Sequence, residues 1–113
     1  MPGPRTESPR YALALPDGDL HYTQAGAGAP ILLIHGSLCD YRYWRWQVPA
    51  LADTYRVIAP SLRGCWPDAR LHPRAEYAVD RHAGDLAHLL RALDETGGAH
   101  VVGHSRGAQV ALA

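Results

Sequence analysis

Lysine is absent from this chain, and all 11 of its basic residues are arginine. Enzymes that form a Schiff base with their substrate need a lysine amine, and a nucleotide-binding P-loop places a lysine on the phosphates. The sequence therefore excludes Schiff-base aldolases and P-loop NTPases.

A net charge is also lacking, since 11 acidic residues balance the 11 basic ones. Proteins that bind nucleic acid or an anionic membrane surface usually attract it with an excess of positive charge. We therefore expect a small-molecule substrate and neither nucleic acid nor membrane as a partner. The oligomeric state stays open.

Cysteine is scarce, and Cys39 and Cys65 do not form a C-x-x-C motif. This spacing predicts neither a zinc site nor a redox dithiol, so reduced thiols are favoured over a disulfide. An apolar leader is lacking too, because residues 1–10 are rich in charged residues and proline. Without a secretory signal or membrane anchor, we expect a disordered leader over 1–10 and a cytoplasmic protein.

What is present is an alternation of strand and helix patterns in a chain that is 47% hydrophobic. Two β-prone runs around a Pro-Asp-Gly-Asp turn predict a hairpin, and short unbroken apolar runs predict strands buried on both faces. Apolar residues at helical spacing predict the helices. From Asp40 to Leu51 we expect two short helical pieces, with Pro49 in the first turn of the second. The predicted strands are 11–15, 20–24, 31–34, 55–60 and 99–102, and the further helices are 79–93 and 108–113.

This order predicts an α/β fold: a mostly parallel sheet with an N-terminal hairpin, right-handed crossovers and helices on both faces. Residues 61–76 are rich in arginine and proline and predict a loop. Residues 108–113 favour helix but carry no capping glycine, basic last turn or proline. We therefore expect a partial domain over 11–113 that is truncated in its last helix.

The segment Gly103-His104-Ser105-Arg106-Gly107 lies between a predicted buried strand and a predicted helix. G-x-S-x-G in this context indicates a nucleophile elbow, a strained turn that exposes the serine hydroxyl. A side chain at Gly103 or Gly107 would crowd the strand or the helix beside the turn. We predict that Ser105 is a catalytic nucleophile.

A second motif, His35-Gly36-Ser37, follows the predicted strand 31–34. Acyl transfer needs backbone N–H donors for the developing oxyanion, often one from a neighbouring loop and one from the residue after the nucleophile. We expect these donors to be the N–H groups of Ser37 and Arg106. His104 does not suit the role of base, because neighbouring side chains on a strand point to opposite faces. We interpret both His35 and His104 as packing residues that form a hydrogen bond to backbone.

Other polar and aromatic residues have simpler interpretations. The predicted helix 79–93 carries Asp80 and Asp85, which together with Asp94 are expected to form a solvated polar face. Arg63-Gly64 are expected to shape the loop, Trp44 to lie in the core, and Trp46 and Trp66 to lie either in a pocket mouth or in packing. Four histidines lack metal-ligand spacing and are expected to be exposed, namely His72, His82, His88 and His100.

Four motifs in order carry a resemblance to a known family: His35-Gly36-Ser37, residues 42–51 (RYWRWQVPAL), residues 57–64 (VIAPSLRG) and residues 101–107 (VVGHSRG). The chain resembles the α/β-hydrolase superfamily, in the branch of small esterases, C–C bond hydrolases and cofactor-free haloperoxidases. This resemblance implies an eight-stranded core without a cofactor, in which the acid and histidine of the catalytic triad follow the nucleophile. Neither is in this chain.

The resemblance implies hydrolysis of an ester or related acyl bond through an acyl-serine intermediate, with this chain inactive by itself. The alternative is a non-catalytic truncated product or a half-domain that needs a partner chain. Two residues depart from the family pattern, since Ser61 stands where aspartate is frequent and Trp66 where a second glycine is frequent. Family members that open epoxides or remove halides use aspartate as nucleophile, which Ser105 argues against. Arg106 is a candidate anchor for a substrate carboxylate.

Overall fold

The computed structural model describes residues 10–15, 18–68, 78–95 and 97–112. Residues 1–9 of the expected leader lie outside this part of the chain, whereas Arg10 already belongs to a strand. The loop predicted over 61–76 is described as far as residue 68 and has no helix or strand there. In the described residues, no helix is long and apolar enough to cross a membrane.

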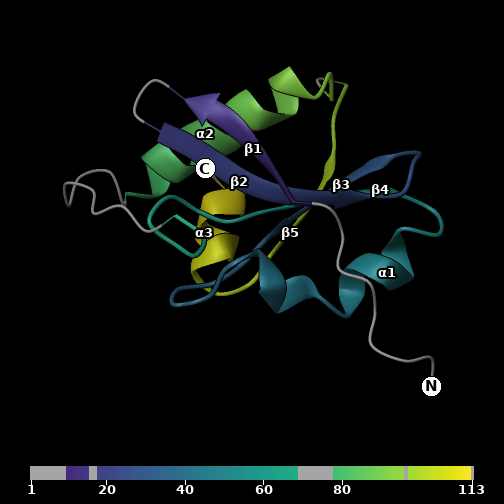
Figure 1. Cartoon of the computed structure of the whole chain (residues 1–113), viewed down its shortest axis with the longest axis horizontal. Coiled ribbons are helices and arrows are strands. Elements are labelled where there is room, and N and C mark those ends of the chain that lie inside the picture. Colours follow the sequence, from purple (N-terminus) through teal and green to yellow (C-terminus); the bar gives the residue numbers. More distant parts are fainter. Residues whose placement is uncertain (1–9, 16–17, 69–77, 96, 113) are drawn as a thin grey trace.

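Five strands form one sheet in the order β1-β2-β4-β3-β5 (Figure 1). The predicted hairpin is present as an antiparallel pair of β1 and β2, and β2 also pairs antiparallel with β4. The strands β4, β3 and β5 run parallel, which confirms the expected α/β class. The strands are β1 (Arg10–Leu15), β2 (Gly18–Ala25), β3 (Pro30–Ile34), β4 (Arg56–Pro60) and β5 (His100–Gly103).

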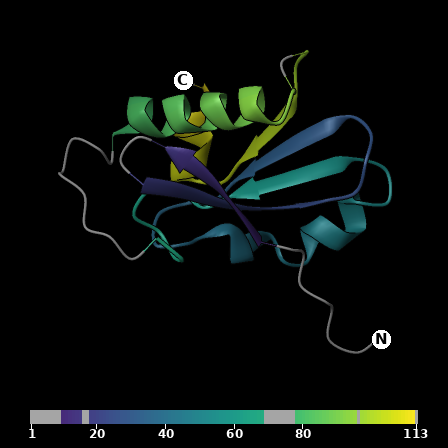
Figure 2. The same cartoon turned by 45° about the horizontal axis from the view of Figure 1, so that its top comes forward.

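Both faces of the sheet are covered, and every residue of β3 and β4 except Arg56 is apolar. Alternate side chains on a strand point to opposite faces. Ile31 and Leu33 pack in one cluster with Trp44 and Val48, which lie on the 3-10 helix η1 (Tyr41–Trp44) and on α1 (Gln47–Leu51). Leu32, Ile34 and Ile58 pack in a second cluster on the other face, together with the helices α2 (Val79–Ala92) and α3 (Arg106–Leu112). Figure 2 shows these two helix layers on either side of the sheet.

The helical pieces after residue 40 match the prediction. Asp40 caps η1 by accepting a hydrogen bond from the backbone N–H of Arg42, and Pro49 lies in the first turn of α1. Proline is tolerated there because the first N–H groups of a helix have no intrahelical acceptor. Trp44 is buried in the core as expected, while Trp46 and Trp66 are exposed.

Two expectations about α2 are wrong. Asp85 is buried instead of lying on a solvated face, because Arg63 reaches it from the loop after β4. His82 is also buried, and its Nδ1 has no hydrogen-bond partner among the described residues. Asp80 and Asp94 are exposed, as are His88 and His100, whereas His72 lies outside the described residues.

The strand β5 is present but is not buried on both faces. Val101 and Val102 are 43% and 44% exposed, because β5 is the outermost strand of the described sheet on its side. Side chains from both faces of β5 are therefore open to solvent, and β5 is an exposed edge of the described sheet.

Candidate active site

Ser105 lies in a sharp turn between β5 and α3. Its backbone φ is +56°, a left-handed conformation that is uncommon for residues other than glycine and that stores strain. The turn is closed by hydrogen bonds from the N–H of Gly107 to the carbonyl of His104 and from the N–H of Ala108 to the carbonyl of Ser105. The Ser105 side chain is exposed at the tip, which is the geometry that the G-x-S-x-G pattern predicts.

The two flanking glycines are required by close backbone approaches. A Cβ at Gly107 would lie 2.2 Å from the carbonyl oxygen of Ile34, and one at Gly103 would lie 2.5 Å from the carbonyl oxygen of Gly107. Real Cβ atoms do not approach backbone oxygens so closely, so any side chain would push α3 away from β3 and β5. The elbow is therefore packed directly against the end of β3.

The loop after β3 contacts the elbow. A Cβ at Gly36 would lie 3.2 Å from the Cβ of Ser105 and 3.0 Å from the carbonyl oxygen of His104. The next residue, Ser37, is exposed, and its N–H has no hydrogen bond in the described part of the chain. The structure thus brings together the two segments from which the sequence predicts oxyanion donors.

His35 is completely buried and makes two hydrogen bonds to backbone. Its Nε2 accepts from the N–H of Leu62 at 2.9 Å, and its Nδ1 lies 2.7 Å from the carbonyl oxygen of Gly36. An amide N–H can only donate and a carbonyl can only accept, so we assign the ring proton to Nδ1. Burial lowers the pKa of His35 below its usual value, which favours this neutral form.

His104 precedes the candidate nucleophile and is exposed. Its ring stacks on that of Tyr43 from η1, with the centroids 4.8 Å apart and an angle of 23° between the planes. This contact is to a side chain and not to backbone as the sequence suggested for His104. It joins η1 to the elbow.

Several further polar contacts hold the loop after β4 in place. The buried guanidinium of Arg63 donates two hydrogen bonds to Asp85 on α2, at 3.0 and 2.9 Å. The hydroxyl of Ser61 accepts from the N–H of Tyr41 at 3.0 Å, and the carboxylate of Asp68 accepts from the N–H of Gly64 at 3.0 Å. Arg63-Gly64 therefore shape this loop as predicted, while the buried partner Asp85 was not identified from the sequence.

The side chain of Arg106 contacts α3 and lies close to α2. Its guanidinium donates to the side-chain oxygen of Gln109 at 3.2 Å. Burial lowers the pKa of His82 on α2 to about 4, and the positive charge of Arg106 adds to this lowering. The role of Arg106 as a carboxylate anchor stays a prediction.

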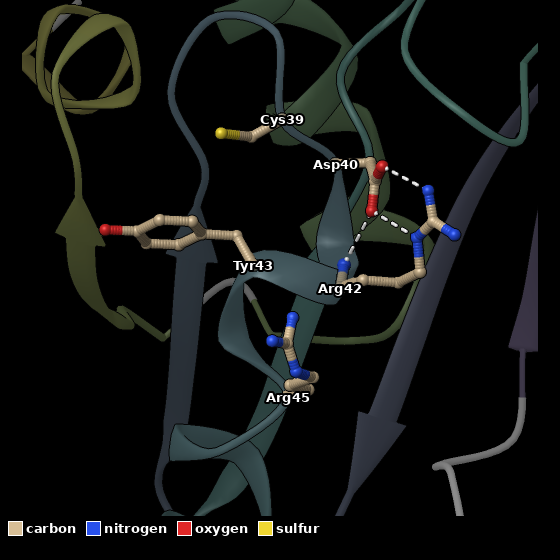
Figure 3. A pocket seen from close by; sticks show the side chains of 5 residues that line it. All are labelled: Cys39, Asp40, Arg42, Tyr43 and Arg45. Atoms are coloured by element: carbon tan, nitrogen blue, oxygen red, sulfur yellow. Dashed lines mark hydrogen bonds and ion pairs between the residues drawn. The ribbon is translucent and has the colours of Figure 1, made fainter.

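A cavity of about 320 Å³ adjoins this region (Figure 3). Asp40 and Arg42 form one side through paired hydrogen bonds of 2.9 Å each. The guanidinium of Arg42 also lies 3.6 Å from the ring centroid of Trp66. The remaining lining residues are Cys39, Tyr43 and Arg45.

Arg45 gives this cavity an excess of positive charge. Within the described residues its guanidinium has no hydrogen bond or ion pair, and it lies 5.4 Å from the ring centroid of Trp46. Arg42, by contrast, is neutralised by Asp40. Because Tyr43 both lines the cavity and stacks on His104, the cavity is next to the elbow.

In the part of the chain that the structure describes, the cysteines and histidines form no metal centre. Cys39 and Cys65 are both half-buried and unbridged, and burial raises the pKa of the Cys65 thiol to about 11. Among the described residues, no group of three or more histidine, cysteine, aspartate or glutamate side chains is placed to hold a metal ion.

Comparisons with known proteins agree with this architecture. The family model of the α/β-hydrolase fold matches residues 29–113. A soluble epoxide hydrolase of Corynebacterium sp. (strain C12) is 37% identical over 95 residues, which cover 82% of this chain and 32% of that protein. The 2-hydroxy-6-oxo-6-(2'-aminophenyl)hexa-2,4-dienoic acid hydrolase of Metapseudomonas resinovorans is 35% identical over 97 residues, covering 83% and 33%.

Solved structures give the same result. An epoxide hydrolase from an endophytic Streptomyces superposes with a TM-score of 0.86 at 32% identity, covering 96% of this chain and 33% of that one. The chain thus spans about a third of the length of the relatives it matches. With most of its length matched in both sequence and fold, the chain belongs to the α/β-hydrolase family.

Proposed function

We propose that Ser105 is the nucleophile of a hydrolase that cleaves an ester or related acyl bond of a small-molecule substrate. The observation that carries this proposal is the exposed Ser105 side chain on a left-handed turn, with the loop at Gly36 directly beside it. A strained serine at this point of the family fold is suited to attack a carbonyl carbon.

In the proposed reaction, the Ser105 oxygen attacks the acyl carbon and the carbonyl oxygen becomes an oxyanion. The backbone N–H groups of Ser37 and Arg106 stabilise this charge. Collapse expels the alcohol and leaves an acyl-serine, which water then hydrolyses. Each oxyanion donor in such a site contributes roughly 10²- to 10³-fold to kcat.

A base is needed to remove the Ser105 proton, and the family places the triad histidine and acid after the nucleophile. The described histidines near the elbow do not suit this role. Both ring nitrogens of His35 are used by backbone, and the ring of His104 is stacked on Tyr43. We therefore expect the base to come from a segment beyond these residues and the 113-residue chain alone to be nearly inactive.

Several relatives are named epoxide hydrolases, yet acyl chemistry suits Ser105 better. A carboxylate that opens an epoxide forms an ester, whose acyl carbon water can attack in a second step. A serine that opens an epoxide would form an ether, which has no acyl carbon and would block the enzyme. Turnover of epoxides is therefore not expected.

The test uses the chain joined to family segments that carry the later acid and histidine. Incubation with p-nitrophenyl acetate, followed by rapid acid quenching and mass spectrometry, should detect an acetyl group on Ser105. The variant Ser105→Ala should lose the adduct and nearly all turnover. The matched control Ser37→Ala should keep most activity because it retains the backbone N–H. An adduct and turnover that persist in Ser105→Ala would reject the proposal.

We further propose that the substrate carries a carboxylate group. The relative from Metapseudomonas resinovorans is named for an acid substrate, and two arginines, Arg45 and Arg106, lie near the elbow. Kinetics of the joined protein on an acidic ester and its neutral analogue, with Arg45→Ala and Arg106→Ala, would test this. A loss confined to the acidic ester identifies the anchor, and an equal loss on both esters removes the idea.

A further inference from the structure

The peptide group between Gly36 and Ser37 is held by its carbonyl oxygen. That oxygen lies 2.7 Å from Nδ1 of His35 and accepts a second hydrogen bond from the N–H of Cys39 at 3.3 Å. In a planar trans peptide the C=O and N–H bonds point in opposite directions. Whatever fixes the Gly36 carbonyl therefore also fixes the direction of the Ser37 N–H.

His35 is itself held in one orientation. Its side chain is 0% exposed, and its Nε2 accepts from Leu62 at 2.9 Å on the far side of the ring. The nearby bond from the Tyr41 N–H to the Ser61 hydroxyl joins the same two loops again. The ring of His35 thus connects the loop after β4 to the peptide group between Gly36 and Ser37.

We infer that His35 is a positioning residue that aims the Ser37 N–H toward the site of the oxyanion beside Ser105. The catalytic meaning of this orientation rests on the proposed function, but the orientation itself does not. Two amide variants separate the two hydrogen bonds of the ring. The side-chain N–H of asparagine lies near the position of Nδ1, and the side-chain oxygen of glutamine lies near that of Nε2.

The experiment measures the residual dipolar coupling of the Ser37 N–H in the aligned, 15N-labelled 113-residue chain. In His35→Asn the coupling should stay close to the wild-type value, because an N–H still reaches the Gly36 carbonyl. In His35→Gln it should change, although the bond to Leu62 is kept. An unchanged coupling in His35→Gln, or an equal change in both variants, would overturn the inference and leave His35 a packing residue.

Variants that fail to fold are covered by a measurement on the wild-type chain. Long-range 15N–1H correlation should place the ring proton on Nδ1, and a 15N–15N coupling across the hydrogen bond should link Nε2 to the Leu62 amide. A proton on Nε2 would overturn the inference.

Activity gives a separate readout in the joined protein. There, His35→Gln should lower kcat about 10- to 100-fold with little change in KM, which is a somewhat smaller loss than removal of an oxyanion donor causes. The kcat of His35→Asn should stay within a few-fold of the wild-type value. The dipolar couplings test the role of His35 without any turnover, whereas the acetyl adduct tests Ser105 as the nucleophile. The two proposals can therefore fail independently.

Discussion

A single methyl group at Gly107 tests how closely the elbow packs against β3. In Gly107→Ala the new Cβ would lie 2.2 Å from the carbonyl oxygen of Ile34 and 2.6 Å from that of His35. Both atoms belong to backbone next to the centre of the sheet, so no side-chain rotation relieves the clash. We expect a loss of about 3 kcal/mol in the free energy of unfolding, at the upper end of the range for overpacking.

Gly84→Ala is the matched control, with the same chemical change and the opposite expected sign. Gly84 lies in the interior of α2, and a Cβ there meets nothing within 4 Å. Alanine should stabilise the helix by about 1 kcal/mol, because glycine loses more backbone entropy on folding. The two variants should therefore differ in unfolding free energy by about 4 kcal/mol.

Urea unfolding of the 113-residue chain, followed by circular dichroism, measures both values. In thermal unfolding the same effects should appear as shifts of about 4 °C or more per kcal/mol. If Gly107→Ala unfolds at the same urea midpoint as the wild-type chain, the elbow does not pack against Ile34 as described. A shift of both variants in the same direction would also show that this contact does not exist.

Three further predictions concern the rest of the molecule. Asp85→Asn should cost about 3–5 kcal/mol in urea unfolding because it removes the carboxylate charge from the buried ion pair with Arg63. A loss below about 1 kcal/mol, which is typical of an exposed ion pair, would contradict this. Stability should fall as the pH is lowered from about 6.5 toward about 4, because burial lowers the pKa of His82 to about 4 and the unfolded chain takes up the proton first. His82→Gln should flatten this slope and the exposed His88→Gln should not; equal slopes in both would refute the assignment. Val102→Lys should reduce self-association in analytical ultracentrifugation, since it places a charge on the exposed strand β5. A wild-type chain that is monomeric at all concentrations would contradict both the predicted self-association and the need for a partner chain.

The central strands could be predicted because a short run of consecutive apolar residues indicates a strand that is buried on both faces. In β3 and β4 every residue except Arg56 is apolar, and both faces of each strand are covered by helices. The same reasoning fails for Val101 and Val102. Their apolar pattern specifies a strand suited to burial, but burial also depends on a neighbouring strand, and no strand of the described sheet lies on that side of β5.

Asp85 shows a different limit of sequence reasoning. Its burial depends on Arg63, which is 22 residues away along the chain and reaches α2 only because the loop after β4 folds over that helix. A signal was nevertheless present in the spacing. His82, Asp85 and Leu89 follow one another at i, i+3 and i+7, so Asp85 lies beside the apolar stripe and not on the opposite face.

The candidate site combines a local motif with a contact that sequence alone leaves undetermined. The elbow is local, because the glycines that allow a turn at Ser105 are within two residues of it. The approach of His35-Gly36 to this turn depends on the order of the strands. Once β3 and β5 are neighbours and parallel, with Ile34 opposite Gly103, the residues that follow each strand must emerge side by side at the same edge of the sheet. This register therefore brings Ser37, which follows β3, and the turn of Ser105 and Arg106, which follows β5, to one end of the sheet. A shift of the register would move Ser37 away from that turn.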